Sequence, residues 1–395
     1  MITIKKMKPS CEKPRIIMKR FLKTLPAFAP LGWRVNGSHC LRAVLPSVFA
    51  VFAVGWQADA FTIVPTFDVT ITSDPQAATI EATINSAIAV YEADFSDPVT
   101  AYITFYQSTT GLGGSTTFGE NFAYTDYLAA LVSHATTADD ATALAHLPNT
   151  TGNPVNGNSD VWIRLVLARA LGLTSDVGTP DSSISINMSA CNLSSAQHDP
   201  TKYSLFAVVS HEIDEAIGFG SELNGVDNGT PPPTGPVEAE DLFRYTTSGA
   251  RSWTTAANAA AYCSFDGVTD IARFNQNQNG DFADWYSPGG QTPQVQDAFG
   301  TPGSTPVLGV ELRVLDAIGF TRNPSPVWVD FNYSGPQDGT YLNPYSTLAQ
   351  GVTAVPTGRT IVINSTVQPS TSSETMTITK AMLITSVNGP ATIGH

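Results

Sequence analysis

The stretch HEIDE at residues 211–215 contains residue types that bind divalent metal ions. His211 and Glu215 are four positions apart, and on a helix two side chains at this spacing project from the same side, one turn apart. An imidazole nitrogen and a carboxylate oxygen are both ordinary zinc ligands. The spacing therefore predicts that His211 and Glu215 bind one ion together if the segment is helical.

The surrounding residues predict a helix over residues 203–219. Its apolar residues fall on one side of a helical wheel, which we expect to face the core: Leu205, Val209, Ile213, Ala216 and Ile217. Gly218 predicts the end of this helix, with a positive φ. An amphipathic helix with a merely charged outer face is the alternative, because an isolated His-Glu-x-x-Glu pattern fits both.

Glu212 directly follows the first predicted ligand. In helices with the pattern His-Glu-x-x-His, the glutamate at this position is a general base that accepts a proton from the attacking water. Glu215 occupies the place of the second histidine of that pattern. We therefore predict that Glu212 is the catalytic base of a hydrolytic metal site, with Glu215 as an unusual ligand.

Several later segments resemble those of one protein family. Together with HEIDEAIGFGS, they occur in an order similar to that in secreted bacterial metallopeptidases, which resemble leishmanolysin-type metzincins. Some members of that group carry glutamate as the second ligand. The resemblance covers roughly residues 61–322, and its later segments are EDLFRYTTSGARSW, FNQNQNGDFADW, QDAFG and ELRVLDAIGF.

The resemblance implies a secreted, metal-dependent endopeptidase that acts on a protein or peptide substrate. His211 and Glu215 correspond to the first two zinc ligands, and Glu212 corresponds to the base. Ala-Asp-Trp falls where the family has Ser-His-Trp, which makes Asp284 the candidate third ligand. Asp241 and Glu222 are weaker candidates, and for both the alternative is a solvated or loop-capping acid.

Two departures from the family pattern affect the expected chemistry. Carboxylates replace two histidine ligands, and QDAFG, the counterpart of the family's Met-turn, has no methionine. Two anionic ligands leave a bound water less acidic and extend the choice of metal from Zn²⁺ toward Mn²⁺ or Fe²⁺. The alternative function is therefore a catalytically weak or inactive peptidase-like scaffold that binds an extracellular polysaccharide or a surface.

The other candidate residues are less specific. His134 and His146 lie in helical patterns and are expected at the surface or the edge of the core, whereas His198 precedes the metal helix and is either a further ligand or a turn residue. The sequence offers no Gly-x-Ser-x-Gly elbow, phosphate loop or nucleophilic Cys/His pair as a competing catalytic centre.

Residues 1–60 have the pattern of a secretory signal peptide with a long basic lead. An uncharged run from Ala43 to Trp56 is followed by Ala58-Asp59-Ala60, an A-x-A exit. The run is short for a membrane span, which makes a membrane anchor the less favoured alternative. We expect export to the extracellular space, with the periplasm or the cell surface as other destinations, and translation that starts at Met1 or at a later site such as Met18.

The mature chain is predicted to be strongly acidic. Ten of the 20 basic residues but only two of the 34 acidic residues precede residue 61, so a chain cut after Ala60 has 32 acids, ten bases and a net charge of −22. This charge argues against nucleic acid or anionic lipid as partner. Cys191 and Cys263 remain after the cut, either as one disulfide or as two buried thiols.

The pattern of residues 61–322 predicts an α+β domain. β-branched and aromatic residues indicate strands at 61–72, 99–106 and 182–187. Helical periodicity follows at 75–95, and further helices are expected at 124–134, 138–146 and 160–171.

Residues 323–395 form a predicted β-rich C-terminal module that resembles the first coils of a pectate-lyase-like parallel β-helix. Four short strands are expected at 326–331, 360–365, 375–380 and 381–386, with one helix at 345–355. A truncated β-helix and a small capped β-module are both compatible with so few repeats. All predicted ligands precede this module, so we expect it to be dispensable for catalysis; glycan or surface contact is one role open to it.

Overall fold

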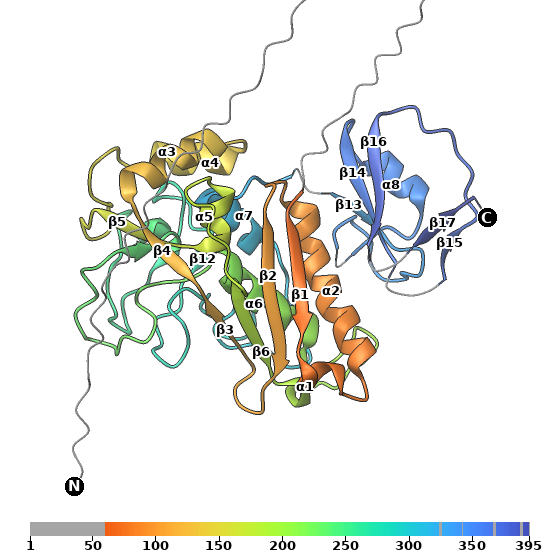
Figure 1. Ribbon diagram of the computed structural model, residues 1–395, viewed down its shortest axis with the longest axis horizontal. Helices are drawn as coiled ribbons and strands as arrows, with labels where there is room; N and C mark the ends of the chain where they lie inside the picture. Colours follow the sequence, from red (N-terminus) through yellow and green to blue (C-terminus); the bar gives the residue numbers. More distant parts are fainter. Residues whose placement is uncertain (1–59, 324–325, 342, 366–368, 388–389, 395) are drawn as a thin grey trace, which may run out of the picture. The chain divides into compact units, whose positions relative to one another are not determined.

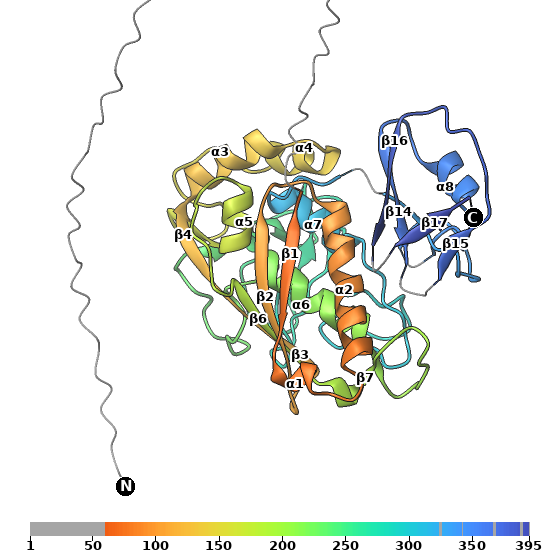
Figure 2. The same ribbon diagram turned by 45° about the vertical axis from the view of Figure 1, so that its right-hand side comes forward.

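The computed structural model describes residues 60–323, 326–341, 343–365, 369–387 and 390–394. These residues form a mixed α/β structure with several small sheets (Figures 1 and 2). Nearly all of the predicted leader lies outside the described residues. Within the described part of the chain, no helix combines the length and the apolar character needed to cross a membrane.

The largest sheet has four strands in the order β1-β2-β6-β3. β1, β2 and β6 pair in parallel, and β3 pairs antiparallel with β6 at one end of the sheet. Side chains alternate between a buried and a more exposed face, as expected for half-covered strands. The strands are β1 (Thr62–Phe67), β2 (Thr100–Gln107), β3 (Gly113–Thr117) and β6 (Ser182–Ile186).

Helices α2 (Ala77–Asp94) and α6 (Leu205–Ile217) pack against this sheet and against each other (Figures 1 and 2). The Tyr91 hydroxyl of α2 donates to Oδ1 of Asp214 on α6 at 2.8 Å, inside the core. The predicted helix over 203–219 is confirmed with slightly narrower bounds. Ser204 caps it, because its side chain accepts a hydrogen bond from the Ala207 amide.

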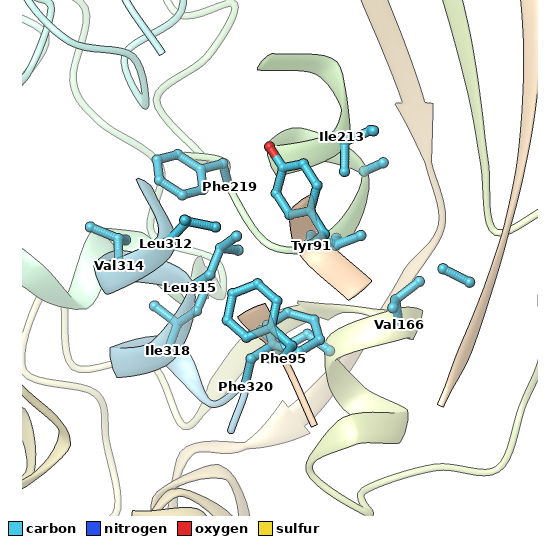
Figure 3. Close-up of a cluster of buried hydrophobic side chains, with 14 of the residues drawn as sticks. Tyr91, Phe95, Val166, Ile213, Phe219, Leu312, Val314, Leu315, Ile318 and Phe320 are labelled. Carbon is cyan, nitrogen blue, oxygen red and sulfur yellow. The ribbon is translucent and has the colours of Figure 1, made fainter. Parts of the chain in front are cut away.

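Helix α7 (Val310–Ile318) lies against the C-terminal end of α6, where Leu315 and Ile318 are next to Gly218. Figure 3 shows Leu315 and Ile318 of α7 among the buried side chains of Tyr91, Phe95 and Phe219. Gly218 closes α6 with φ −165°, so the predicted positive φ is wrong. A Cβ at Gly218 would lie 2.7 Å from Leu315 Cδ2, and glycine is needed for this close approach.

Two predicted elements differ from the structure. The expected strand over 61–72 stops at Phe67, and Val69–Thr72 forms the short helix α1, because the Asp68 side chain accepts from the Thr70 amide and caps a helical turn. The expected helix over 160–171 begins as strand β5 (Asp160–Arg164) before α5 (Leu165–Ala170). Buried and half-buried residues alternate along β5, which pairs with neighbouring strands on both sides.

The remaining elements up to residue 322 are short. The predicted helices at 124–134 and 138–146 are confirmed as α3 (Tyr124–His134) and α4 (Ala138–Ala145). The rest are β4 (Gly119–Ala123), β7 (Cys191–Asn192), β8 (Tyr203–Ser204), β9 (Val237–Glu238), β10 (Arg244–Tyr245), β11 (Tyr262–Cys263), β12 (Ala272–Arg273) and the 3₁₀ turns Met188–Ala190 and Glu240–Phe243.

The C-terminal residues contain parallel strand pairs. β13 (Val327–Val329), β14 (Arg359–Asn364) and β16 (Met382–Val387) form one parallel sheet. β15 (Ser370–Ser372) and β17 (Ala391–Ile393) pair in parallel as well, and α8 (Leu348–Ala354) lies where a helix is expected. The predicted strand at 375–380 is wrong, since no described strand pairs with this mostly exposed segment.

Buried apolar side chains gather in two clusters. The larger one includes the buried faces of the four-stranded sheet, α2, α6 and α7. The smaller one consists of Val329, Leu348, Val355, Ile361 and Ile363. Cys191 and Cys263 are both buried and free, so the disulfide alternative is not realised.

Candidate metal centre

Three predicted ligands converge in the structure. His211, Glu215 and Asp284 each offer a ligand atom, and these atoms all lie within 4.8 Å of one another. The Nε2 atom of His211 is 3.6 Å from Oε1 of Glu215 and 3.8 Å from Oδ1 of Asp284. Helix α6 supplies the first two residues one turn apart, and the loop after β12 supplies the third.

The imidazole of His211 is held in a fixed orientation. Its Nδ1 lies 3.0 Å from the carbonyl oxygen of Val295. Because Nδ1 is engaged there, Nε2 is the ring atom that faces Glu215 and Asp284. A hydrogen bond from the second ring nitrogen to a backbone carbonyl is the usual arrangement around metal-binding histidines.

Both carboxylates have neighbours that orient them. The Ser115 hydroxyl of β3 donates to Oε2 of Glu215 at 2.6 Å, which leaves Oε1 facing the imidazole. The Gln296 amide nitrogen donates to Oδ1 of Asp284 at 3.0 Å and lies 3.3 Å from Nε2 of His211. Gln296 Oε1 is buried and has no partner among the described residues. Rotation of this amide by 180° would present an oxygen to the same point.

Glu212 lies beside the three converging residues and is almost fully buried. Its Oε2 atom has no hydrogen-bond partner within the described chain. The carboxylate packs against β3, where a Cβ on Gly113 would lie 2.2 Å from Oε1. Gly113 therefore makes the space for this carboxylate, and any side chain at position 113 would displace it.

The four side chains border a cavity of about 440 Å³. Residues of β3, of α6 and of the segments 279–284 and 294–306 line it. Three further acids besides the predicted ligands line it: Glu212, Asp281 and Asp297. A cavity of this size lies within the usual range of ligand-binding pockets, roughly 300–1,000 Å³.

The electrostatics of the cluster reflect an excess of carboxylates. Burial raises the pKa of Asp284 to about 8, and burial together with Glu215 raises the pKa of Glu212 well above its usual value. Burial would lower the pKa of His211, but Asp284, Glu215 and Glu212 outweigh it and raise that pKa well above normal. The carboxylates of the cluster therefore carry more negative charge than one protonated imidazole neutralises.

These residues fit a divalent ion in three respects. The donor set of one imidazole nitrogen and two carboxylate oxygens is one that zinc and harder divalent metals accept. The atoms are arranged around a single point. The buried, unpartnered oxygens of Glu212 and Gln296 lie at its edge, and such atoms are rarely left without a partner in folded proteins.

The weaker sequence candidates do not join this centre. The Asp241 carboxylate accepts hydrogen bonds from the Ser221 hydroxyl and from the amides of Glu222 and Glu238, which makes it a loop-organising residue. Glu222 and the three other histidines considered also lie outside the cluster. Among those histidines, His134 contacts Asp97 and Thr321, His146 contacts the Thr142 carbonyl oxygen, and His198 borders a separate cavity.

Sequence reasoning missed several residues of the centre. Gln296 is the first residue of QDAFG, which the sequence analysis interpreted only as a Met-turn counterpart without methionine. Asp281 lies three positions before Asp284. Ser115 and Gly113 lie on a short strand about 100 residues before the helix. Asp281 and Gln296 are close in sequence to acidic residues of the motifs, and this proximity could have identified them. No neighbouring residue in the sequence indicates a role for Ser115.

Comparison of the chain with protein-family models, curated proteins and solved structures gave no match. The resemblance to metzincin-type peptidases therefore stays a prediction from the motifs, and the case for function depends on the centre itself.

Proposed function

We propose that the chain is a secreted metal-dependent endopeptidase, with His211, Glu215 and Asp284 as metal ligands and Glu212 as general base. The observation that carries the proposal is the convergence of three ligand atoms within 4.8 Å beside a buried Glu212 oxygen that has no hydrogen-bond partner among the described residues. A bound divalent ion, Zn²⁺ in the first place, would supply a Lewis acid that polarises the scissile carbonyl.

Glu212 has the position required of the proton-transfer group. Its free Oε2 would accept a proton from the attacking water while the water oxygen bonds to the carbonyl carbon. As the C–N bond breaks, Glu212 would return that proton to the leaving amine nitrogen.

Strand β3 supports a peptide as the substrate. It is the terminal strand of the four-stranded sheet, and Gly113, Gly114 and Ser115 line the cavity. A terminal strand can hydrogen-bond an extended peptide through its backbone, which positions the peptide without regard to side-chain sequence. A peptide held along β3 would pass over the side chains of α6.

The proposal is tested by the metal content and hydrolysis of the purified protein. We expect about one divalent ion per chain by mass spectrometry, and digestion of an unfolded protein that a chelator stops and added Zn²⁺ restores. Glu215→Ala and Asp284→Ala should lose the ion. Glu222→Gln, which changes an acid outside the cluster, should keep it.

Two outcomes would contradict the proposal. Unchanged metal content in both ligand variants would reject the assigned ligands. A folded wild-type protein that binds no ion and cleaves no peptide would favour the polysaccharide- or surface-binding scaffold instead.

A further inference from the structure

A second cavity adjoins the candidate metal centre. It has a volume of about 370 Å³, and Gln294, Asp297 and Thr301 border both cavities. Apolar and aromatic groups make up much of its wall, including Ile271, Trp285, Tyr286, Pro288 and Val310. Trp285 directly follows the predicted ligand Asp284, so one short segment serves both cavities.

Arg273 is the basic residue among the residues that line this second cavity. It ends strand β12, and its guanidinium carbon lies 4.0 Å from the centre of the Tyr286 ring. The Arg273 Nε is buried without a hydrogen-bond partner, and no described carboxylate comes within 4.0 Å of the guanidinium. The aromatic ring therefore holds the cation in place but does not neutralise it.

Most other arginines of the described chain are paired differently. Arg251 is similar to Arg273, since it lies 4.1 Å from the Tyr245 ring centre and its buried Nη1 has no partner in the described chain, but its Nη2 donates to the His146 carbonyl oxygen. Each of four has a carboxylate partner within 4.0 Å: Arg164 with Glu238, Arg169 with Asp181, Arg313 with Asp139 and Arg322 with Asp94. Arg244 donates instead to the carbonyl oxygens of Phe282 and Asn275 and to Oε1 of Gln276. In a chain with so many acids, an oriented guanidinium without an anion in a cavity indicates a place for an anionic ligand group.

We propose that the second cavity is a substrate subsite that binds a peptide carboxylate through Arg273. This inference rests on the proposed peptidase function, because it assigns part of the substrate of that site. The carboxylate has two possible sources, an aspartate or glutamate side chain and the C-terminus of the peptide. Both offer the planar pair of oxygens that a guanidinium binds with two parallel hydrogen bonds.

The acids of the first cavity limit the substrate positions at which a carboxylate is expected to bind. Glu212 and Asp281 line the first cavity and not the second, so acidic substrate side chains placed there meet like charges, whereas Asp297 borders both cavities. A carboxylate should therefore be preferred at one position relative to the scissile bond, the one that reaches Arg273, and disfavoured at neighbouring positions. A general attraction to acidic peptides is not expected from a chain of this net charge.

The test uses peptide pools in which one position at a time is varied. C-terminally amidated peptides with an internal glutamate isolate the side-chain source, and peptides with a free C-terminus isolate the other. We expect Arg273→Gln to lower kcat/KM about 10- to 100-fold for peptides with the preferred carboxylate, and to leave peptides without it unchanged. Arg273→Glu should shift the preference at that position to lysine or arginine.

Two control variants separate loss of charge from loss of folding. Arg273→Lys keeps the charge and should retain part of the preference. Arg359→Gln removes an exposed arginine from β14 and should change nothing. An unaltered acidic preference in folded Arg273→Gln would overturn the subsite.

Binding distinguishes failure of the subsite from failure of the peptidase proposal. Fluorescence anisotropy with labelled carboxylate-containing and carboxylate-free peptides is measured on Glu212→Gln protein with and without Arg273→Gln. Discrimination that depends on Arg273, together with a wild-type protein that hydrolyses no peptide, would reject the peptidase function alone. Hydrolysis by a wild-type protein that shows no such discrimination would reject the subsite alone.

Discussion

Helices α6 and α7 have closely similar C-terminal ends, but the glutamates Glu212 and Glu311 that they carry differ in their hydrogen-bond partners. α6 runs into Ala-Ile-Gly-Phe at residues 216–219, and α7 runs into the same four residues at 317–320. Glu311 on α7 accepts hydrogen bonds from Trp285 Nε1 and from the amides of Gln296 and Gly309. Glu212 on α6, equally buried, has an oxygen without a partner in the described chain.

The difference shows that donors, and not burial, separate a structural carboxylate from a candidate reactive one. The three donors to Glu311 fix the segment that carries Asp284 and Gln296, which gives this glutamate a positioning role behind the centre. Glu212 keeps an acceptor free next to the ligands, where a proton can be exchanged. The predictions that follow test this contrast.

The largest effect is expected at Glu212. Glu212→Gln should reduce peptide hydrolysis about 10²- to 10⁴-fold, because an amide cannot accept the proton from water. Metal content and melting temperature should stay close to those of wild type, as measured by mass spectrometry and calorimetry. Full activity in this variant would remove Glu212 from the mechanism.

A smaller effect is expected at Gln296. Gln296→Ala should weaken metal binding about 10- to 100-fold, the usual range for a partner that orients a ligand. Competition with a fluorescent chelator measures this affinity directly. Gln294→Ala is a matched control, since Gln294 borders the same cavity but its side-chain amide donates to the Thr292 carbonyl oxygen and not to a predicted ligand. Equal affinities in the two variants would contradict the role of Gln296.

For Glu311, the contrast with Glu212 predicts that substitution lowers the stability of the folded protein. Glu311→Gln should lower the free energy of unfolding by about 1–3 kcal/mol, because a buried amide cannot accept from all three donors. Urea denaturation measures this change, and Glu212→Gln serves as the comparison. A Glu311→Gln protein as stable as wild type would show that these donors do not distinguish the two helices.

The last prediction concerns pH and Asp316, near the end of α7. Burial raises the pKa of Asp316 to about 7 from an ordinary value of 3.8. The folded chain therefore holds the proton more tightly than the unfolded chain, and this acid's contribution to stability is present below pH 4 and lost as the pH rises to 7. Relative to Asp316→Asn, the wild type should lose stability over that interval in denaturation curves at stepped pH; parallel curves would contradict this.

The sequence predicted the features that depend on local geometry. The helix around His211 and the shared face of His211 and Glu215 follow from helical spacing alone. The family resemblance brought in Asp284, and the structure places it beside that pair. Ser115 and Gly113 could not be predicted, because their nearness to the helix arises only from the pairing of β3 with β6.

The errors in secondary structure have a related cause. DVWIR at 160–164 has apolar residues compatible with helix or strand, and its strand partners β4 and β9 decide the outcome. The alternating segment 375–380 has the pattern of a strand, yet no described strand pairs with it. Local patterns identify segments that are able to form strands, and tertiary pairing selects among them.

The chain positions of the converging residues have a consequence for the unfolded state. About 70 residues separate His211 from Asp284, and Cys191 and Cys263 are both free, so no disulfide between described cysteines restrains this stretch. An ion held by both ends would act as a reversible cross-link. By the loop-closure estimate for a cross-link, closing a loop of this length destabilises the unfolded chain by roughly 4 kcal/mol. Chelation would then release chain entropy and make the fold itself dependent on metal supply.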